Sequence, residues 1–543
     1  MIRRSRLIGA AGVCLIVLFV AWTAKHTGAG IDQYADQQYF INNLNGFVHN
    51  SRFPFVQFGP NDVAVESSYG YTFQAITFIA SWALASIRND AFNPFSAGTY
   101  TDKNVMVALL AIGAFWAVYH ATRSLTGRRR TAVAATVILA LSPVFTGHAL
   151  MNQKDIPLAV GFTALTAGTI ALVGRLQRRQ TMDDRALTRR FGSATTMGVL
   201  LGTGIAFTIG TRPGSVVVVL LDLAIIVAVV VSTKAHTSWR LLQAAVIGLC
   251  SGTAVVLATN SAAWPNPVSW LLHGIDVARG FPSWRGKVLV DGLFHNYDAQ
   301  PRWYLPFMLA VQTPVIIAVL TVIAAWFLLT RLISARHPAR SLLLWSPLAV
   351  QLLVLPLAGV LQGSLFYNAA RQALFVLPAM AIVAAVGLQA IDRMVTGRRV
   401  RIAVASVVAI AALSPVVDTV TLFPYQYVYF NELERTDDLT DRFEFDYWGI
   451  SARETQQWVN RHYPSAVEVY PIGWQFPPFG NGTVTFAGNW NSAGDRERIF
   501  AANYYPSWEV DQYFDCPIVH RVTRQLWASE IVLGYVRRCT GIR

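Results

Sequence analysis

Long apolar runs alternate with short polar loops over the first 420 residues of the chain. A helix needs about 20 predominantly apolar residues to cross a bilayer, and runs of roughly that length recur along the sequence. We predict spans at 7–24, 104–120, 131–148, 156–174, 195–210, 214–232, 242–260, 305–330, 343–360, 373–391 and 402–420. The pattern therefore predicts a polytopic all-α membrane protein with about 11 transmembrane helices, in a domain covering residues 1–420.

Segment 71–87 is apolar enough to be a twelfth span, and the distribution of basic residues argues against this. If the N-terminus is cytoplasmic and 71–87 does not cross, the N-terminus and the cytoplasmic loops hold 22 Lys and Arg residues, against 11 in the longer loops opposite. Basic residues accumulate in cytoplasmic loops. We therefore predict that 71–87 is an interface helix inside a first outer loop, 25–103. A plain span is the alternative.

The composition changes after residue 420. The tail, 421–543, holds 15 of the 30 acidic residues and no apolar run of span length. The same charge distribution places the tail outside the cytoplasm, where we predict a small α/β domain. Outside the reducing cytosol, Cys516 and Cys539 are expected to form a disulfide, with two free thiols as the alternative.

The net charge of +14 over 543 residues could suggest a nucleic-acid partner. The basic residues lie in short loops between apolar runs, however, which is typical of a membrane protein. The sequence contains no Cys/His metal spacing, no P-loop and no Gly-rich turn after a strand. We therefore expect a multi-pass plasma-membrane protein that acts at the outer face without nucleic acid.

Acidic residues at the outer ends of the predicted spans are the first candidates for chemistry. Asp32 and Asp36 follow the first span and would share a helix face, because they lie four residues apart. Asp155 precedes Pro157 at the start of another span, where a helix N-terminus favours a carboxylate. Solvated loop acids and a helix cap are the structural alternatives. Asp222 lies inside an apolar span, and we expect it to be a hydrogen-bonded structural acid.

Two arginines lie at outer helix ends and suit an anion. Arg212 follows one span in the turn TRPG, and Arg371 lies in FYNAARQ before a later span. Guanidinium groups bind phosphate through paired hydrogen bonds, although a snorkelling arginine is the alternative. The second long outer loop, 261–304, mixes aromatic and basic residues, which suits either a sugar or an interfacial belt.

These features resemble the polyprenyl-phosphate-dependent glycosyltransferases of the GT-C fold, in particular the protein-mannosyltransferase-like branch. The family carries an acid after its first span, as in Asp36-Gln37-Gln38-Tyr39, where Gln37 replaces the usual Glu. Further matches are the segments 154–157 (KDIP), 367–371 (YNAAR) and 446–449 (DYWG). The family also carries interface helices in its first outer loop, which agrees with the prediction for 71–87.

The resemblance implies inverting transfer of a sugar from a polyprenyl phosphate to an acceptor hydroxyl on a glycan, lipid or protein. Mannose is the family default, and a pentose is the alternative. Asp36 would be the general base with Asp32 as its rival, and Asp155 would orient the acceptor or stabilise the site. Arg212 or Arg371 would hold the leaving phosphate. The resemblance also implies a reaction without a metal or a cofactor, with the lipid-linked sugar as donor substrate. The predicted substrate-binding residues are Arg212, Arg371, Lys154, Tyr39, His148 and Tyr367. A transporter or flippase of lipid-linked sugars and a non-catalytic envelope-assembly protein are the other classes considered.

This assignment has a geometric consequence. Asp155 should lie near Asp36 across one outward cavity, although about 120 residues separate them in the chain. We expect Lys154 to point away from these carboxylates or toward the donor phosphate.

Overall fold

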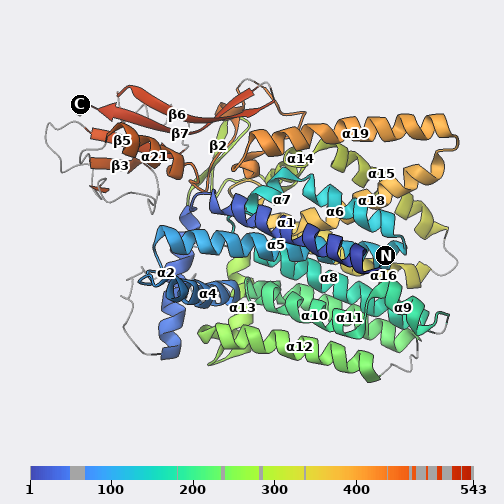
Figure 1. Ribbon diagram of the computed structural model, residues 1–543. Helices are drawn as coiled ribbons and strands as arrows, with labels where there is room; N and C mark the ends of the chain where they lie inside the picture. The colour runs from blue at the N-terminus through green and yellow to red at the C-terminus, as the bar shows by residue number, and fades with distance from the viewer. Residues whose placement is uncertain are drawn as a thin grey trace.

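The computed structural model describes residues 2–48, 68–179, 181–233, 239–280, 285–334, 338–436, 438–463, 468–472, 485–486, 498–503, 516–527 and 529–539. Most of these residues form a bundle of helices that run roughly alongside one another, and a sheet of C-terminal strands lies at one end of the bundle (Figure 1).

Nine predicted spans correspond to helices that are long and apolar enough to cross a membrane, within the described part of the chain. They are α5 (Ala97–Thr126), α8 (Asp155–Arg178), α9 with α10 (Asp184–Phe191, Ala194–Ile209), η1 with α11 (Pro213–Ser215, Val216–Thr233), α12 (Trp239–Thr259), α15 (Val315–Ile333), α16 with η3 and α17 (Pro338–Ala349, Val350–Val354, Leu355–Gln362), α18 (Val376–Met394) and α19 (Arg398–Thr421). The prediction of a multi-pass, mostly helical membrane protein is confirmed.

Helix α8 is the centre of the bundle, since its whole apolar stretch is buried inside the protein. Small residues allow its neighbours to approach closely. A Cβ on Gly161 would lie 2.6 Å from the backbone nitrogen of Thr208 on α10, and a Cβ on Gly204 would lie 2.7 Å from Leu165 of α8. The start of this helix, which carries Asp155, is therefore held at a fixed position.

Two other predicted spans are shorter or interrupted. Helix α1 (Ile2–Lys25) covers 7–24, and its described apolar part is Cys14–Lys25. The predicted span 131–148 divides into α6 (Arg129–Ala140) and α7 (Pro143–His148), because Pro143 has no N–H for a continuing helix.

The predicted helix 305–330 is also wrong as one element, since it divides into α14 (Tyr304–Val311) and α15 on either side of Pro314. The carbonyls exposed at this break are bonded by Asn431 of the tail. Its backbone N–H donates to the Val311 carbonyl at 2.7 Å, and its side-chain amide donates to the carbonyls of Ala310 and Thr313 at 2.8 and 2.9 Å. The tail thus begins as part of the helical bundle.

The first predicted outer loop forms two further helices, α2 (Ile31–Val48) and α4 (Thr72–Arg88). The bounds of α4 agree with those of the helix predicted at 71–87, and its position at the membrane interface stays a prediction. Both helices lie at the end of the bundle that also carries the C-terminal strands, whereas the N-terminus and α9 lie at the opposite end (Figure 1). The loop 261–304 contains η2 (Ser261–Ala263), α13 (Pro267–Arg279) and a hairpin of β1 (Lys287–Val290) and β2 (Leu293–Asn296).

The tail contains short helices and one sheet. Its elements are η5 (Gln426–Val428), α20 (Leu439–Arg442), α21 (Ala452–His462), β3 (Glu468–Ile472), β4 (Thr485–Phe486), β5 (Arg498–Asn503), β6 (Ile518–Leu526) and β7 (Ser529–Cys539). The sheet order is β4-β3-β5-β7-β6, parallel from β4 to β5 and antiparallel from β5 to β6.

Cys516 is disulfide-bonded, whereas Cys14 and Cys250 are free. The side chain of its predicted partner, Cys539, lies outside the described residues.

The segment between α20 and α21 joins this sheet to the membrane domain. The Ser451 hydroxyl donates to the Leu533 carbonyl of β7 at 2.9 Å. Arg453 donates to the carbonyls of Lys25 and Thr27, at 2.8 and 2.9 Å, at the end of α1. Gly28 lies so close that a Cβ there would be 2.3 Å from the Ile450 carbonyl oxygen.

Candidate functional site

Three carboxylates, from α2 and the start of α8, each form an ion pair at the same end of the bundle. Helix α2 places Asp32 and Asp36 one turn apart, as predicted. Arg371 Nη1 lies 2.6 Å from Asp32 Oδ2, and Lys154 Nζ lies 2.6 Å from Asp36 Oδ1. Arg212 Nη2 lies 2.6 Å from Asp155 Oδ1. Segments that are far apart in the sequence therefore meet at one charged cluster, which we call the acid–base cluster.

Lys154 does not have the predicted orientation. It was expected to point away from the carboxylates or toward a donor phosphate, and instead its ammonium contacts Asp36 directly. The reason is electrostatic, because a buried carboxylate without a partner is costly and an adjacent buried ammonium offsets that cost. The ammonium also lies 4.1 Å from the centre of the Tyr69 ring.

The Asn152 side chain binds backbone N–H groups at the start of α8, while the Asp155 carboxylate is bound by other side chains. Asn152 Oδ1 accepts hydrogen bonds from the backbone N–H groups of Lys154 and Asp155, at 3.1 and 2.8 Å. The carboxylate of Asp155 instead accepts from the Asn152 amide, at 3.0 Å, and from Arg212. The structure gives the Asp155 carboxylate two side-chain partners, whereas the helix cap was the structural alternative.

A fourth basic side chain lies beside the acid–base cluster. Lys103, on α5, is 1% exposed and donates to the side-chain oxygens of Gln37 and Gln74. Within the part of the chain that the structure describes, no carboxylate lies within 4.0 Å of its ammonium. Lys103 therefore adds a buried basic side chain beside the three ion pairs, and its ammonium nitrogen is bound by neutral amides.

The two acids on α2 have opposite pKa shifts. Burial raises the pKa of Asp36, and the neighbouring charge of Asp32 adds to this effect, while Lys154 opposes it. Burial also acts to raise the pKa of Asp32, but the charges of Arg371 and Lys154 outweigh it and hold that pKa below its usual value. A pKa closer to neutrality suits a general base, so the shifts favour Asp36 over Asp32 for that role.

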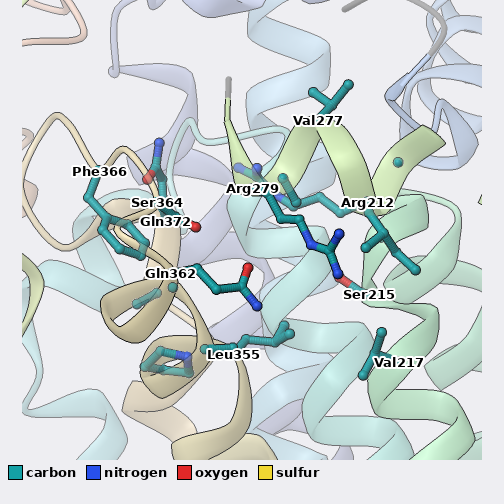
Figure 2. A pocket seen from close by; sticks show the side chains of 18 of the residues that line it. Arg212, Ser215, Val217, Val277, Arg279, Leu355, Gln362, Ser364, Phe366 and Gln372 are labelled. Atoms are coloured by element: carbon teal, nitrogen blue, oxygen red, sulfur yellow. The ribbon is translucent and has the colours of Figure 1, made fainter. Parts of the chain in front are cut away.

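An apolar cavity of about 370 Å³ opens beside the acid–base cluster. Its apolar wall is formed by residues of α11, α13, α17 and the segment before α18: Val217, Ile275, Val277, Leu355, Ala358 and Phe366. Figure 2 shows Arg212 and Arg279 on one side of this cavity, with Gln362 and Phe366 on the other. The cavity therefore combines an apolar wall with guanidinium groups, and Arg212 belongs to both the cavity and the cluster.

The remaining predicted site residues differ in their surroundings. Tyr367 lines the cavity, and the Arg371 guanidinium carbon lies 5.0 Å from the centre of its ring. Tyr39 packs with Phe40 and Tyr71 in a satellite cluster of apolar side chains. His148 is fully buried, and both of its ring nitrogens have protein partners. Asp222 accepts a hydrogen bond from Thr169 at 3.2 Å, as expected of a structural acid.

Several polar atoms near the cluster are buried without a hydrogen-bond partner among the described residues. They include Nε of Arg212, Nε of Arg371 and both amide atoms of Gln153, whose side chain lines a small cleft beside Asp36. Such atoms suit a polar ligand that bonds them. No group of three or more His, Cys, Asp or Glu side chains in the described ranges has the geometry of a metal site.

Sequence reasoning missed the contributions of Lys103, Arg279, Tyr447 and Trp448. Tyr447 and Trp448 come from the tail, and the Trp448 ring centre lies 4.7 Å from the Arg371 guanidinium carbon. The DYWG motif containing both residues was visible in the sequence, but nothing in that motif indicates which surface it contacts. Lys103 was missed because the predicted loop 25–103 ends at this residue, whereas the structure places it inside α5.

Comparisons with known proteins add two similar folds. No family model and no curated protein matches the chain. The crystal structure of ArnT from Cupriavidus metallidurans bound to undecaprenyl phosphate is 12% identical, with a TM-score of 0.46 over 98% of both chains. Archaeal oligosaccharyltransferase AglB from Archaeoglobus fulgidus, in complex with an inhibitory peptide and a dolichol-phosphate, is 14% identical, with a TM-score of 0.43 over 86% of this chain and 62% of that one. Neither similarity is high enough to assign a function.

Proposed function

We propose that this protein is a GT-C-type membrane glycosyltransferase that moves a sugar from a polyprenyl phosphate to an acceptor hydroxyl. The observation that carries the proposal is the joint position of the acid–base cluster and the apolar cavity, with Arg212 shared between them. A lipid-linked sugar phosphate has the matching chemistry, since it joins an apolar chain to an anion and a polar sugar.

The donor would place its isoprenoid chain against the apolar cavity wall and its phosphate beside the guanidinium groups. Arg212 and Arg279 line the cavity, and Arg371 is held nearby by Asp32 and Tyr367. Guanidinium groups bind phosphate oxygens through charge-assisted hydrogen bonds, and the buried Nε atom of Arg212 is a donor without a protein acceptor among the described residues. The sugar would then lie next to the carboxylates.

The reaction that suits these groups is a direct displacement. The acceptor oxygen attacks the anomeric carbon, the bond between that carbon and the phosphate oxygen breaks, and the configuration inverts. Asp36 takes the acceptor's proton, and the leaving phosphate keeps the electron pair and is stabilised by the arginines. Asp155, held by Asn152 and Arg212, orients the acceptor.

Asp36 is the proposed base, and its raised pKa is the reason for preferring it. Asp32 has the more exposed side chain of the two, 30% against 7%, and is the rival base. Lys154, paired with Asp36, would have to shift its ammonium toward the substrate as the acceptor enters.

Among the donors, mannose is the first sugar to test and a pentose the second, with a glycan, a lipid or a protein as acceptor.

The loop charges favour an outer-face reaction. The N-terminus and α9 lie at the end of the bundle opposite the acid–base cluster's helix α2, and their segments are rich in arginine (Figure 1). By the positive-inside rule this end would be cytoplasmic, so the cluster and the tail would face outward at the plasma membrane.

A transporter or flippase of lipid-linked sugars would need the same ligand chemistry. Such proteins are commonly built from repeated halves with interrupted helices around a site near the membrane midplane. The ionisable groups of this chain instead cluster at one end of the bundle, which favours transfer. A non-catalytic envelope-assembly protein would not need three neighbouring carboxylates, each held by a cation.

Substitution of the proposed base tests the proposal. We expect Asp36→Asn to lower the turnover of a purified, reconstituted protein by roughly 10²–10⁴-fold, because it removes general-base catalysis. Asp155→Asn should also impair turnover, and thermal unfolding would verify that this variant folds. Asp102→Asn is the matched control, since Asp102 forms a surface ion pair with Arg88 outside the cluster. Full turnover in folded Asp36→Asn and Asp155→Asn variants would contradict the site assignment.

A further inference from the structure

A chain of hydrogen bonds leads from the tail to a carboxylate of the acid–base cluster. The Tyr447 hydroxyl lies 3.1 Å from Nε2 of His148, and His148 Nδ1 lies 3.1 Å from the Asn152 side-chain nitrogen. The same Asn152 nitrogen donates to Asp155 Oδ2 at 3.0 Å. His148, Asn152 and Asp155 are each at most 1% exposed, so water does not compete for these bonds.

The direction of each bond in this chain follows from Asn152. Its Oδ1 faces the backbone N–H groups of Lys154 and Asp155, and this contact fixes which side of the amide is oxygen. The amide nitrogen must therefore donate both to Asp155 and to His148 Nδ1. With Nδ1 acting as an acceptor, the imidazole is neutral, carries its proton on Nε2 and donates to the Tyr447 oxygen.

The tail segment that supplies Tyr447 is itself held firmly. The Asp446 carboxylate accepts hydrogen bonds from the backbone N–H groups of Ile450 and Ser451, both at 2.8 Å, and from the Tyr427 hydroxyl. Asp446 has a φ of 41°, a left-handed conformation that these bonds hold in place. The turn presents Tyr447 to His148 and the next residue, Trp448, to Arg371.

We infer that Tyr447 and His148 are positioning residues for the transferase reaction, and that the tail completes the active site. Acting through Asn152, they fix one oxygen of Asp155 while Arg212 fixes the other. This inference rests on the proposed function and adds to it, because it assigns to His148 a role in orientation in place of substrate contact. It also gives the tail's DYWG segment a part in catalysis.

Substitutions that remove one member of the hydrogen-bond chain test the inference. Tyr447→Phe deletes only the hydroxyl, and we expect it to lower kcat roughly 3–10-fold, the effect of one lost buried hydrogen bond, with the donor KM within twofold of wild type. Tyr463→Phe is the matched control, because it deletes a phenolic hydroxyl from the same tail and keeps the ring packed against Trp458. It should retain wild-type kcat.

A double substitution separates positioning from a general loss of packing. If both residues act through one chain, the Tyr447→Phe/His148→Gln variant should be no slower than His148→Gln alone. The inference would be overturned if the loss of kcat in the double variant equalled the product of the two single losses. Wild-type kcat in a folded Tyr447→Phe variant would also overturn it. Thermal unfolding of each purified variant shows whether it is folded.

The histidine tautomer gives a readout that needs no turnover. Nitrogen-15 solid-state NMR of histidine-labelled protein, with the His148 signal assigned by its loss in His148→Gln, should show a neutral ring protonated at Nε2. A proton on Nδ1 would contradict the proposed chain of hydrogen bonds even if the protein is an active transferase. Conversely, a protein that shows the expected tautomer but releases no polyprenyl phosphate would contradict the proposed function and still support the chain of hydrogen bonds.

Discussion

At the scale of single residues, the ion pairs explain how three carboxylates, two of them buried, lie in one cluster. Each carboxylate has a basic side chain at 2.6 Å. Asp32 pairs with Arg371, Asp36 with Lys154 and Asp155 with Arg212. The sequence identified the acids and the arginines as candidates, because they lie at the outer ends of the predicted spans. It did not predict the pairing, because the partner of Asp32 is Arg371, 339 residues away, and only the packed bundle decides which charges meet.

The pH profile distinguishes the two candidate bases. The base must be ionised to act, so kcat/KM should fall as the pH falls through the pKa of the base. Burial raises the pKa of Asp36. If Asp36 is the base, this acid limb of the pH profile should therefore lie above the ordinary aspartate pKa of 3.8. Lys154→Met removes a charge that lowers this pKa, so the acid limb should move to higher pH.

Arg371→Met serves as the comparison, because Arg371 is the charge that most lowers the pKa of Asp32. If Asp36 is the base, Arg371→Met should move the acid limb less than Lys154→Met does. A larger upward shift in Arg371→Met would instead assign the base role to Asp32. The measurement is kcat/KM for the donor across pH in both variants, and it is independent of their absolute rates.

At the scale of elements, the apolar pattern predicted most helices and missed the interruptions. The runs 104–120 and 156–174 were located correctly because long apolar stretches have few alternatives in a membrane. The breaks before Pro143 and Pro314 were overlooked, although each proline was a visible signal. The second break depends on Asn431, whose bonds to the freed carbonyls come from a remote segment that no local pattern reveals.

The contact between the tail and the end of α1 gives a prediction for one glycine. Gly28→Ala would place a Cβ 2.3 Å from the Ile450 carbonyl oxygen, and the displaced backbone should lower the free energy of unfolding by about 1–3 kcal/mol. Gly280→Ala is the matched control, since a Cβ there meets nothing within 4 Å. Thermal unfolding of both variants in detergent measures the difference, and equal stabilities would show that the contact at Gly28 is not tight.

At the scale of the whole molecule, loop charge and element position agree. The N-terminus and α9, both rich in arginine, lie at one end of the bundle, while α2, α4 and the C-terminal strands lie at the other (Figure 1). The sequence therefore predicted which segments share a side. The arrangement of the tail sheet was beyond sequence reasoning, because its parallel and antiparallel strands are paired through remote contacts.

Cysteine labelling tests the orientation. In a protein with Cys14 and Cys250 replaced by Ala, Asp298→Cys should react with a membrane-impermeant maleimide in right-side-out vesicles. Thr181→Cys, in the exposed connection between α8 and α9, should react only after the vesicles are opened. The reverse pattern would place the acid–base cluster in the cytoplasm and contradict the proposed topology.

The fate of the donor lipid tests the central claim most directly. Purified protein in sealed vesicles would receive polyprenyl phosphate carrying a labelled sugar, mannose first and a pentose second, with a panel of glycan, lipid and protein acceptors. We predict that polyprenyl phosphate is released in equal amount to labelled product, and that Asp36→Asn abolishes both while Asp102→Asn does not. Movement of the intact donor across the bilayer, with its bond to the sugar unbroken, would contradict the account and identify a transporter.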